Sequence, residues 1–154
     1  MDIFSDLVIR RYRYDDFAAV SKLFYETVHS VNAKDYSADQ LDAWAPNVNC
    51  LQARRADLLR QNTLIAQMQG VTVGFGSVDG CGCLDMLFVH KDFQRCGIAA
   101  ALCGELEYGF SVVKVYASVT AKPFFEKRGY TVVKEQEAER FGVKLKNYEM
   151  VKRA

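Results

Sequence analysis

Residues 88–102 read FVHKDFQRCGIAAAL, and this stretch decides most of what the sequence predicts about the fold. It has the pattern of an apolar strand end, a short polar turn and a helix whose first turn carries Gly97 and alanines. Small side chains leave the backbone N–H groups of such a turn uncovered. The first N–H groups of a helix lack an intrahelical partner, and with the helix dipole they form a site for an anionic phosphate. We therefore expect a phosphate-binding turn between Gln94 and Ala100.

Strands and helices extend from this turn in both directions along the chain. Apolar runs typical of strands occupy residues 7–10, 63–68, 71–78, 84–90, 112–117, 130–136 and 143–151. Ser37 and Gln40 have the spacing of a capping box, and Gly129 is expected to end the last helix. The other candidate N-caps of helices are Asp15 or Asp16, Asn49, and Ser118 or Thr120. This order of elements predicts an α/β fold with a mixed, mostly antiparallel central sheet flanked by helices, in a single domain over residues 1–154.

Composition and charge argue against several classes of protein. Half of the 154 residues are apolar, which is enough for one real core, and 20 basic and 19 acidic side chains give a net charge of +1. Without a basic stripe, nucleic acid is not expected as a partner. No apolar run has the length of a membrane span, and the acidic start of the chain is unlike a secretory signal.

The cysteines indicate a reducing compartment rather than a disulfide framework or a metal centre. They are odd in number and have neither the spacing of a disulfide-rich module nor that of a zinc site: Cys50, Cys81, Cys83, Cys96 and Cys103. The two histidines do not complete a plausible ligand set. We therefore expect a cytoplasmic protein without a bound metal.

Two segments resemble signatures of one enzyme family. Gln94-x-x-Gly97-x-Ala99 resembles the Gln/Arg-x-x-Gly-x-Gly/Ala pyrophosphate loop of the GNAT-superfamily N-acetyltransferases, which hold acetyl-coenzyme A (acetyl-CoA). Residues 117–130 resemble the second signature, a strand end followed by Ala-x-x-Phe-Tyr-x-x-x-Gly-Phe/Tyr. Residues 84–89 match the fourth strand of the family in position. The resemblance covers nearly the whole chain and implies a small, single-domain GNAT fold of the bacterial type.

The resemblance also implies where acetyl-CoA would bind. Backbone groups of Leu87, Phe88 and Val89 would pair with the pantetheine arm, as a strand added to a splayed sheet. The expected pyrophosphate loop consists of Gln94, Arg95, Cys96, Gly97, Ile98, Ala99 and Ala100. Further cofactor contacts are expected from Ser118, Phe124 and Phe125.

The implied chemistry is direct transfer of the acetyl group to an amine, which requires a neutral amine and a proton for the leaving thiolate. Asp85 is the candidate base, because alternation along the strand would place it on the same side as Leu87 and Val89. Whether Asp85 is instead a solvated or helix-capping carboxylate stays open. Phe125 stands where many members have a tyrosine that protonates the thiolate, so Ser118, Tyr116 or Tyr148 would have to replace it unless the thiolate leaves unprotonated.

The helices before residue 60 are expected to select the acceptor, an amine of a small molecule or a peptide. Tyr25, His29 and Trp44 are the candidate substrate-binding residues, although ordinary packing of these side chains is an alternative. The rival function is a non-catalytic acetyl-CoA-binding or protein-interaction domain, favoured by Phe125. The sequence is compatible with a monomer or a homodimer.

Overall fold

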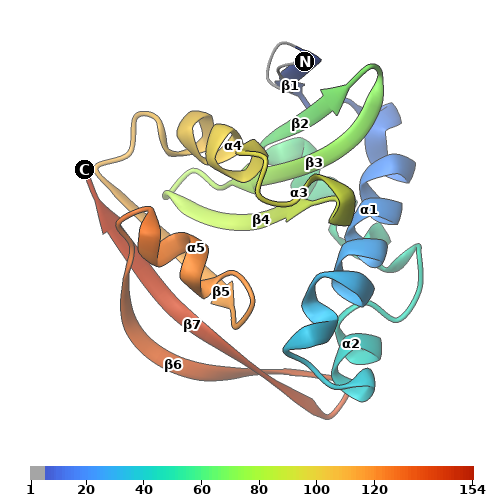
Figure 1. Ribbon diagram of the computed structural model, residues 1–154, viewed down its shortest axis with the longest axis vertical. Helices are drawn as coiled ribbons and strands as arrows, with labels where there is room; N and C mark the ends of the chain where they lie inside the picture. Colours follow the sequence, from blue (N-terminus) through green and yellow to red (C-terminus); the bar gives the residue numbers. More distant parts are fainter. Residues whose placement is uncertain (1–5) are drawn as a thin grey trace.

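The computed structural model describes residues 6–154; residues 1–5, which include most of the acidic start of the chain, lie outside the described part. The central sheet confirms the predicted strands within one or two residues, except that β6 continues to Arg140 instead of ending near Gln136. Its strands are β1 (Leu7–Arg11), β2 (Asn62–Met68), β3 (Val71–Val78), β4 (Cys83–Val89), β5 (Val112–Ser118), β6 (Thr131–Arg140) and β7 (Val143–Arg153) (Figure 1).

Helices occupy the connections before β2 and on either side of β5. They are α1 (Phe17–Ser30), α2 (Ala38–Trp44), α3 (Arg55–Arg60), α4 (Ile98–Glu107) and α5 (Lys122–Lys127). The single helix predicted after Asn49 is wrong in detail, because a 3-10 helix over Cys50–Arg54 precedes the short α3. Within residues 6–154 the Asn49 side chain makes no capping hydrogen bond.

Local capping signals predict some helix ends correctly and others not. The capping box of α2 is confirmed, since Ser37 Oγ accepts from the Gln40 N–H at 3.2 Å and Gln40 Oε1 accepts from the Ser37 N–H at 2.8 Å. Asp16 stands at the start of α1, but its carboxylate binds Arg10 at 2.7 Å rather than the helix. Gly129 ends α5 with a φ of +98°, as expected for a left-handed C-cap.

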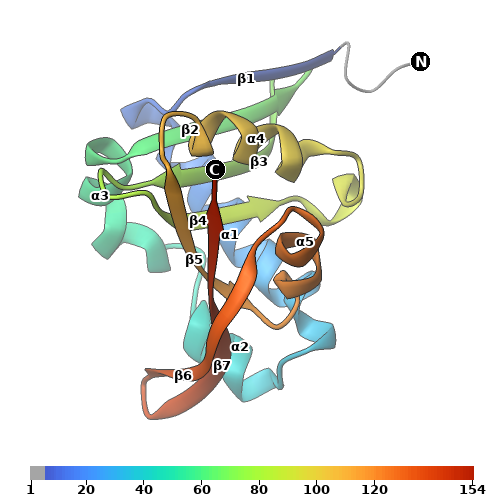
Figure 2. The same ribbon diagram turned by 90° about the vertical axis from the view of Figure 1, so that its left-hand side faces the viewer.

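The sheet order is β1-β2-β3-β4-β5-β7-β6. All neighbouring strands are antiparallel except β4 and β5, which are parallel and, in the described chain, pair only at Cys83–Lys114 and Leu84–Val115. The mixed, mostly antiparallel sheet that the sequence predicts is therefore confirmed. Figures 1 and 2 show the result of the short parallel pairing, in which the β5–β7 ribbon turns away from β4.

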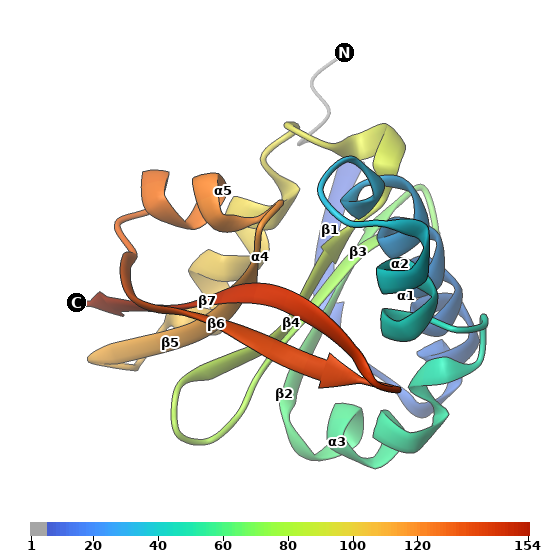
Figure 3. The same cartoon turned by 90° about the horizontal axis from the view of Figure 1, so that it is seen from below.

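Helices cover both faces of the sheet (Figure 3). On one face, α4 and α5 pack over a cluster of buried side chains that includes Ile98, Leu102 and Phe125. On the other face, α1, α2 and α3 pack over a second cluster that includes Phe24, Phe75 and Met86. The α1–α3 face and the α4–α5 face are named below by these helices.

Glycines on β3 bring α4 close to the sheet. A Cβ at Gly76 would lie 2.9 Å from Leu106 Cδ1 and 3.1 Å from the Met86 carbonyl oxygen. A Cβ at Gly74 would lie 3.2 Å from Ile98 Cγ2. These separations are shorter than ordinary van der Waals contacts. The position of α4, and of the turn before it, therefore depends on positions 74 and 76 being glycine.

We expect Gly76→Ala to lower the free energy of unfolding by about 1–3 kcal/mol, because the new methyl group overpacks the contact between β3 and α4. Thermal or urea unfolding measures the loss. Gly80→Ala is the matched control, since a Cβ at Gly80 meets nothing within 4 Å. Equal stability of the two variants would show that α4 can move away from β3 without cost.

A half-buried carboxylate connects the C-terminal end of α4 to the residues that follow α5. Glu107 accepts hydrogen bonds from Arg128 Nη2 at 2.7 Å and from the Tyr130 hydroxyl at 2.5 Å. Burial opposes ionisation of Glu107, yet the hydrogen bonds from Arg128 and Tyr130 outweigh it and lower the pKa of the carboxyl group. This contact joins the end of α4 to the residues that follow α5.

Candidate active site

The open edge of β4 is the main feature of the candidate site. Leu87, Phe88 and Val89 pair with Gly76, Phe75 and Gly74 of β3 on one side. On the other side, the pairing with β5 stops at Leu84. The backbone groups of Phe88 point to β3, since its carbonyl oxygen lies beside Gly74 and the next hydrogen bond of that ladder runs from the His90 N–H to the Val73 carbonyl. In the described chain Leu87 and Val89 therefore present their backbone groups to the space between the diverging strands (Figure 2). An open strand edge of this kind can pair with another extended chain of alternating donors and acceptors.

The turn after β4 places unpaired N–H groups at the end of this edge. Arg95 and Gly97 have left-handed backbones, with φ of +61° and +82°. The first hydrogen bond of α4 runs from the Ala101 N–H to the Gly97 carbonyl at 3.0 Å. The N–H groups of Ile98, Ala99 and Ala100 therefore precede the helical ladder, as an anion-binding helix start requires.

The side chains of this turn mainly build the turn itself. The Gln94 side-chain amide donates to the Val89 carbonyl at 2.5 Å, which closes the turn back onto the end of β4. The Cys96 thiol lies 3.5 Å from the Gln94 carbonyl, and Ile98 is buried under the sheet. Gln94 and Ile98 thus shape the turn. The Arg95 side chain, like that of Gln94, is exposed to solvent.

The corner between β5 and α5 contains the remaining residues expected at the cofactor. Ser118 ends β5, and its hydroxyl accepts from the Ala121 N–H at 3.1 Å. Phe124 is half-buried, whereas Phe125 is only 2% exposed and packs against Tyr130 with ring centroids 5.0 Å apart. The Phe125 ring is therefore part of the core, and its expected contact with the cofactor remains a prediction.

Asp85 lies at a bulge in β4. The ladder passes from the pair Ser77–Met86 to the pair Val78–Leu84 and skips Asp85. Its carboxylate forms an ion pair with Arg54, which also binds Asp57 at 2.7 Å. The alternation argument for Asp85 is therefore wrong, because the bulge turns its side chain to Arg54.

This correction places Asp85 on the α1–α3 face of the sheet. Leu87 and Val89 pack on the opposite face, in the cluster under α4. The next residue of β5 beyond the last parallel pair is Tyr116, which is 46% exposed, and its partner on β7 is Glu149. Glu149 lies 3.7 Å from Lys114 Nζ. A group of polar side chains thus surrounds the point where β4 and β5 part.

The acceptor-side residues that the sequence suggests lie on the α1–α3 face, where Tyr25 and Trp44 pack against the same cluster. The Trp44 ring contacts Phe88 of β4, with centroids 6.3 Å apart. His29 Nε2 donates instead to the Ala45 carbonyl at 2.7 Å, and its ring lies 4.4 Å from that of Tyr25. The structure therefore brings Trp44 to the strand of the candidate site, while the rings of Tyr25 and His29 contact each other on α1.

The candidate site also has neighbouring residues that sequence reasoning did not suggest. Arg54 comes from a segment 31 residues before Asp85, and Lys114 and Glu149 belong to different strands. Tyr36, noted in the sequence only as one polar aromatic residue among several, bonds to two distant segments. No local pattern marks such pairs, because they meet only through the tertiary fold.

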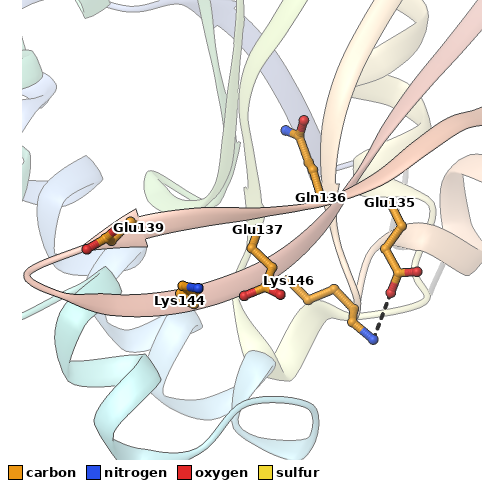
Figure 4. A pocket seen from close by; sticks show the side chains of 6 residues that line it. All are labelled: Glu135, Gln136, Glu137, Glu139, Lys144 and Lys146. Carbon is orange, nitrogen blue, oxygen red and sulfur yellow. Dashed lines mark ion pairs between the residues drawn. The ribbon is translucent and has the colours of Figure 1, made fainter.

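A hollow of about 630 Å³ lies elsewhere, on the twisted β6–β7 ribbon (Figure 4). Its lining is mostly charged, and Glu135 pairs with Lys146 at 2.8 Å. The other lining residues are Gln136, Glu137, Glu139 and Lys144. Opposite charges in this exposed lining offset each other, so the β4 edge remains the better candidate for chemistry.

Residues 6–154 contain no group of three His, Cys, Asp or Glu side chains placed to hold a metal ion. None of the helices over these residues has both the length and the apolar character of a membrane span.

Comparison with known proteins gives consistent matches. Residues 32–152 match the family model of the acetyltransferase (GNAT) domain. The chain is 34% identical over 148 residues to the uncharacterized N-acetyltransferase YafP of Escherichia coli K12, covering 95% of both chains. It is also 34% identical to a GCN5-related N-acetyltransferase from Rhodopseudomonas palustris, whose crystal structure superposes with a TM-score of 0.88 over 96% of this chain and 95% of that one. The PaiA N-acetyltransferase of Thermoplasma acidophilum, solved with coenzyme A, shares the fold at 16% identity with a TM-score of 0.76, over 96% of this chain and 99% of that one.

Proposed function

This chain belongs to the GNAT family of acetyltransferases, and from that premise we propose that it transfers the acetyl group of acetyl-CoA directly to a primary amine of a small molecule or peptide. One structural observation links the proposal to particular residues. The open edge of β4 leads straight into a turn whose helix-start N–H groups lack helical partners. An extended pantetheine arm that ends in a pyrophosphate has the matching shape and charge.

Acetyl-CoA would be held mainly by the backbone. The edge from Leu87 to Val89 would pair with the amide groups of pantetheine, and the N–H groups from Gly97 to Ala100 would bind the pyrophosphate. Gly97 suits this role because glycine has no side chain to cover these N–H groups and adopts the left-handed backbone without strain. Ser118 and Phe124 would line the opposite wall at the start of α5.

Acetyl-CoA supplies the reactive thioester, and the protein has to orient the amine and remove its proton. Holding the amine next to the thioester accounts for much of the rate enhancement in a reaction of this kind. We assign proton removal to Asp85, directly or through a water molecule, from its place beside the point where β4 and β5 part. Arg54 then acts as the partner that holds the carboxylate there.

Direct transfer also fits the state of the neighbouring thiol. Burial raises the pKa of Cys83, so this cysteine remains a thiol and is a poor nucleophile. When the C–N bond forms and the C–S bond breaks, the coenzyme leaves as a thiolate that needs little protonation. Tyr116, Ser118 and Tyr148 are the alternative proton donors in place of Phe125.

A non-catalytic acetyl-CoA-binding domain is the second candidate. It is favoured by the Asp85 carboxylate being engaged by Arg54, and by a phenylalanine at position 125. Tight binding of acetyl-CoA without turnover on any amine would support this candidate over the enzyme.

A panel of primary amines and short peptides tests the proposal. Release of free thiol from acetyl-CoA reports turnover, and mass spectrometry of the products identifies the acetylated amine. The proposal expects at least one amine to gain one acetyl group as one coenzyme A is released. The five cysteines are all free, and on that basis we propose a reducing compartment such as the cytoplasm. A monomer or a homodimer stays a prediction from the sequence.

A further inference from the structure

The hydroxyl group of Tyr36 lies between β7 and the residue that follows β5. It accepts a hydrogen bond from the Val119 N–H at 2.9 Å and donates one to the Lys146 carbonyl at 2.6 Å. Tyr36 belongs to the connection between α1 and α2 and is 8% exposed. Its hydroxyl thus links the α1–α3 face to both β7 and the segment that follows β5.

The two partners of Tyr36 are the next pair of the β5–β7 ladder. The last pair is Ser118 with Asn147, so continued antiparallel pairing would join Val119 to Lys146. The Tyr36 oxygen is inserted at this step, where it replaces a direct bond between the Val119 N–H and the Lys146 carbonyl. The ladder ends there, and the chain turns from β5 into the corner that begins α5.

A second hydrogen bond fixes the same connection to β7. Gln40 of α2 donates through Nε2 to the Lys144 carbonyl at 2.9 Å. Lys144 and Lys146 lie beyond the part of β7 that β5 covers, so side chains from the α2 region take the place of the missing strand. The position of Tyr36 relative to β7 is therefore well defined.

The ring of Tyr36 reaches the other half of the sheet. It packs edge-on against Trp44 with centroids 5.4 Å apart, and Trp44 packs in the same way against Phe88 of β4 at 6.3 Å. Tyr36 and Trp44 therefore span from the β5–β7 ribbon to the strand with the open edge. The backbone pairing of β4 with β5 covers two residue pairs of the described chain, at Cys83 and Leu84. It therefore holds the two strands together only where the opening between them begins.

We propose that Tyr36 is a positioning residue for the cofactor: its hydroxyl sets where β5 leaves β7 and thereby holds the β5–α5 corner at a fixed distance from the open edge of β4. This inference rests on the proposed function, because the opening is where acetyl-CoA would bind. Burial raises the pKa of Tyr36, so the hydroxyl keeps the proton that it donates to Lys146.

The test compares two tyrosine-to-phenylalanine variants by calorimetric titration with coenzyme A. Tyr36→Phe removes the inserted oxygen and keeps the ring that packs on Trp44. Tyr130→Phe is the matched control, because it also removes a hydrogen-bonded hydroxyl, the one that binds Glu107 on the other face. We expect Tyr36→Phe to weaken coenzyme A binding by roughly 5–20-fold and Tyr130→Phe to change it less than about twofold, with a similar loss of Tm in both.

The possible outcomes separate this inference from the proposed function. No binding of coenzyme A by the parent protein would reject the proposed function. Normal binding by the parent together with an unchanged affinity of Tyr36→Phe, or an equal loss in both variants, would overturn the positioning role.

A second measurement uses the unmodified protein in case Tyr36→Phe does not fold. Binding of coenzyme A should slow hydrogen exchange of the Val119 amide, because a fixed opening and a bound ligand stabilise each other. Unchanged exchange at Val119 with coenzyme A bound would also overturn the inference.

Discussion

Gly97→Glu is expected to abolish measurable binding of acetyl-CoA, a loss of at least roughly 100-fold. Gly97 starts α4 with a φ of +82°, a backbone conformation that an L-amino acid adopts only with strain. A glutamate side chain would fill the turn and add a negative charge where the N–H groups should meet the pyrophosphate. Both effects act on the same site, so this is the largest effect on binding that we expect.

Gly142→Glu is the matched control for this prediction. Gly142 has a φ of +77°, and a Cβ there meets nothing within 4 Å, so the strain and the charge change are equivalent. It lies in the β6–β7 turn, away from the turn before α4. Calorimetry should find near-normal affinity in Gly142→Glu. Retained binding in a folded Gly97→Glu protein would mean that the pyrophosphate binds elsewhere.

Asp85→Asn is expected to lower kcat/KM by roughly 10²–10⁴-fold with the amine found in the screen, while the affinity for acetyl-CoA stays nearly unchanged. The amide cannot take the proton of the acceptor. The activity of the parent should fall at low pH, and the remaining rate of the variant should rise with pH as free amine accumulates in solution.

The ion pair with Arg54 requires a control, because Asp85→Asn also alters that guanidinium. Asp57→Asn removes the other carboxylate that binds Arg54 and leaves β4 intact. If Asp85 is the base, Asp57→Asn should retain activity within about tenfold. A loss of less than about tenfold in Asp85→Asn, with an unchanged pH profile, would show that positioning of a neutral amine dominates.

The fold could be predicted well from local signals. The turn at Gly97 needs a positive φ and small neighbours, the capping box of α2 needs Ser37 and Gln40, and alternating apolar residues reveal the strands. These signals operate over a few residues, so the sequence contains them directly. The order of elements and the family resemblance then provided the topology.

The side-chain environment of the site could not be predicted in the same way. A single bulge redirects Asp85 to Arg54, and strand alternation assumes that no bulge is present. The insertion of Tyr36 between Val119 and Lys146 joins residues separated by 83 and 110 positions. Such contacts depend on the packed fold. The need for glycine at positions 74 and 76 of β3 likewise depends on α4, which packs directly against them.

Amide hydrogen exchange of the unmodified protein, with and without saturating acetyl-CoA, tests the central claim most directly. The account predicts slower exchange for the Leu87 and Val89 N–H groups on the open edge and for those of Ile98, Ala99 and Ala100. These groups would gain hydrogen-bond partners from the pantetheine arm and the pyrophosphate. Saturation with acetyl-CoA that leaves both segments unchanged, while exchange slows at other parts of the chain, would contradict the account.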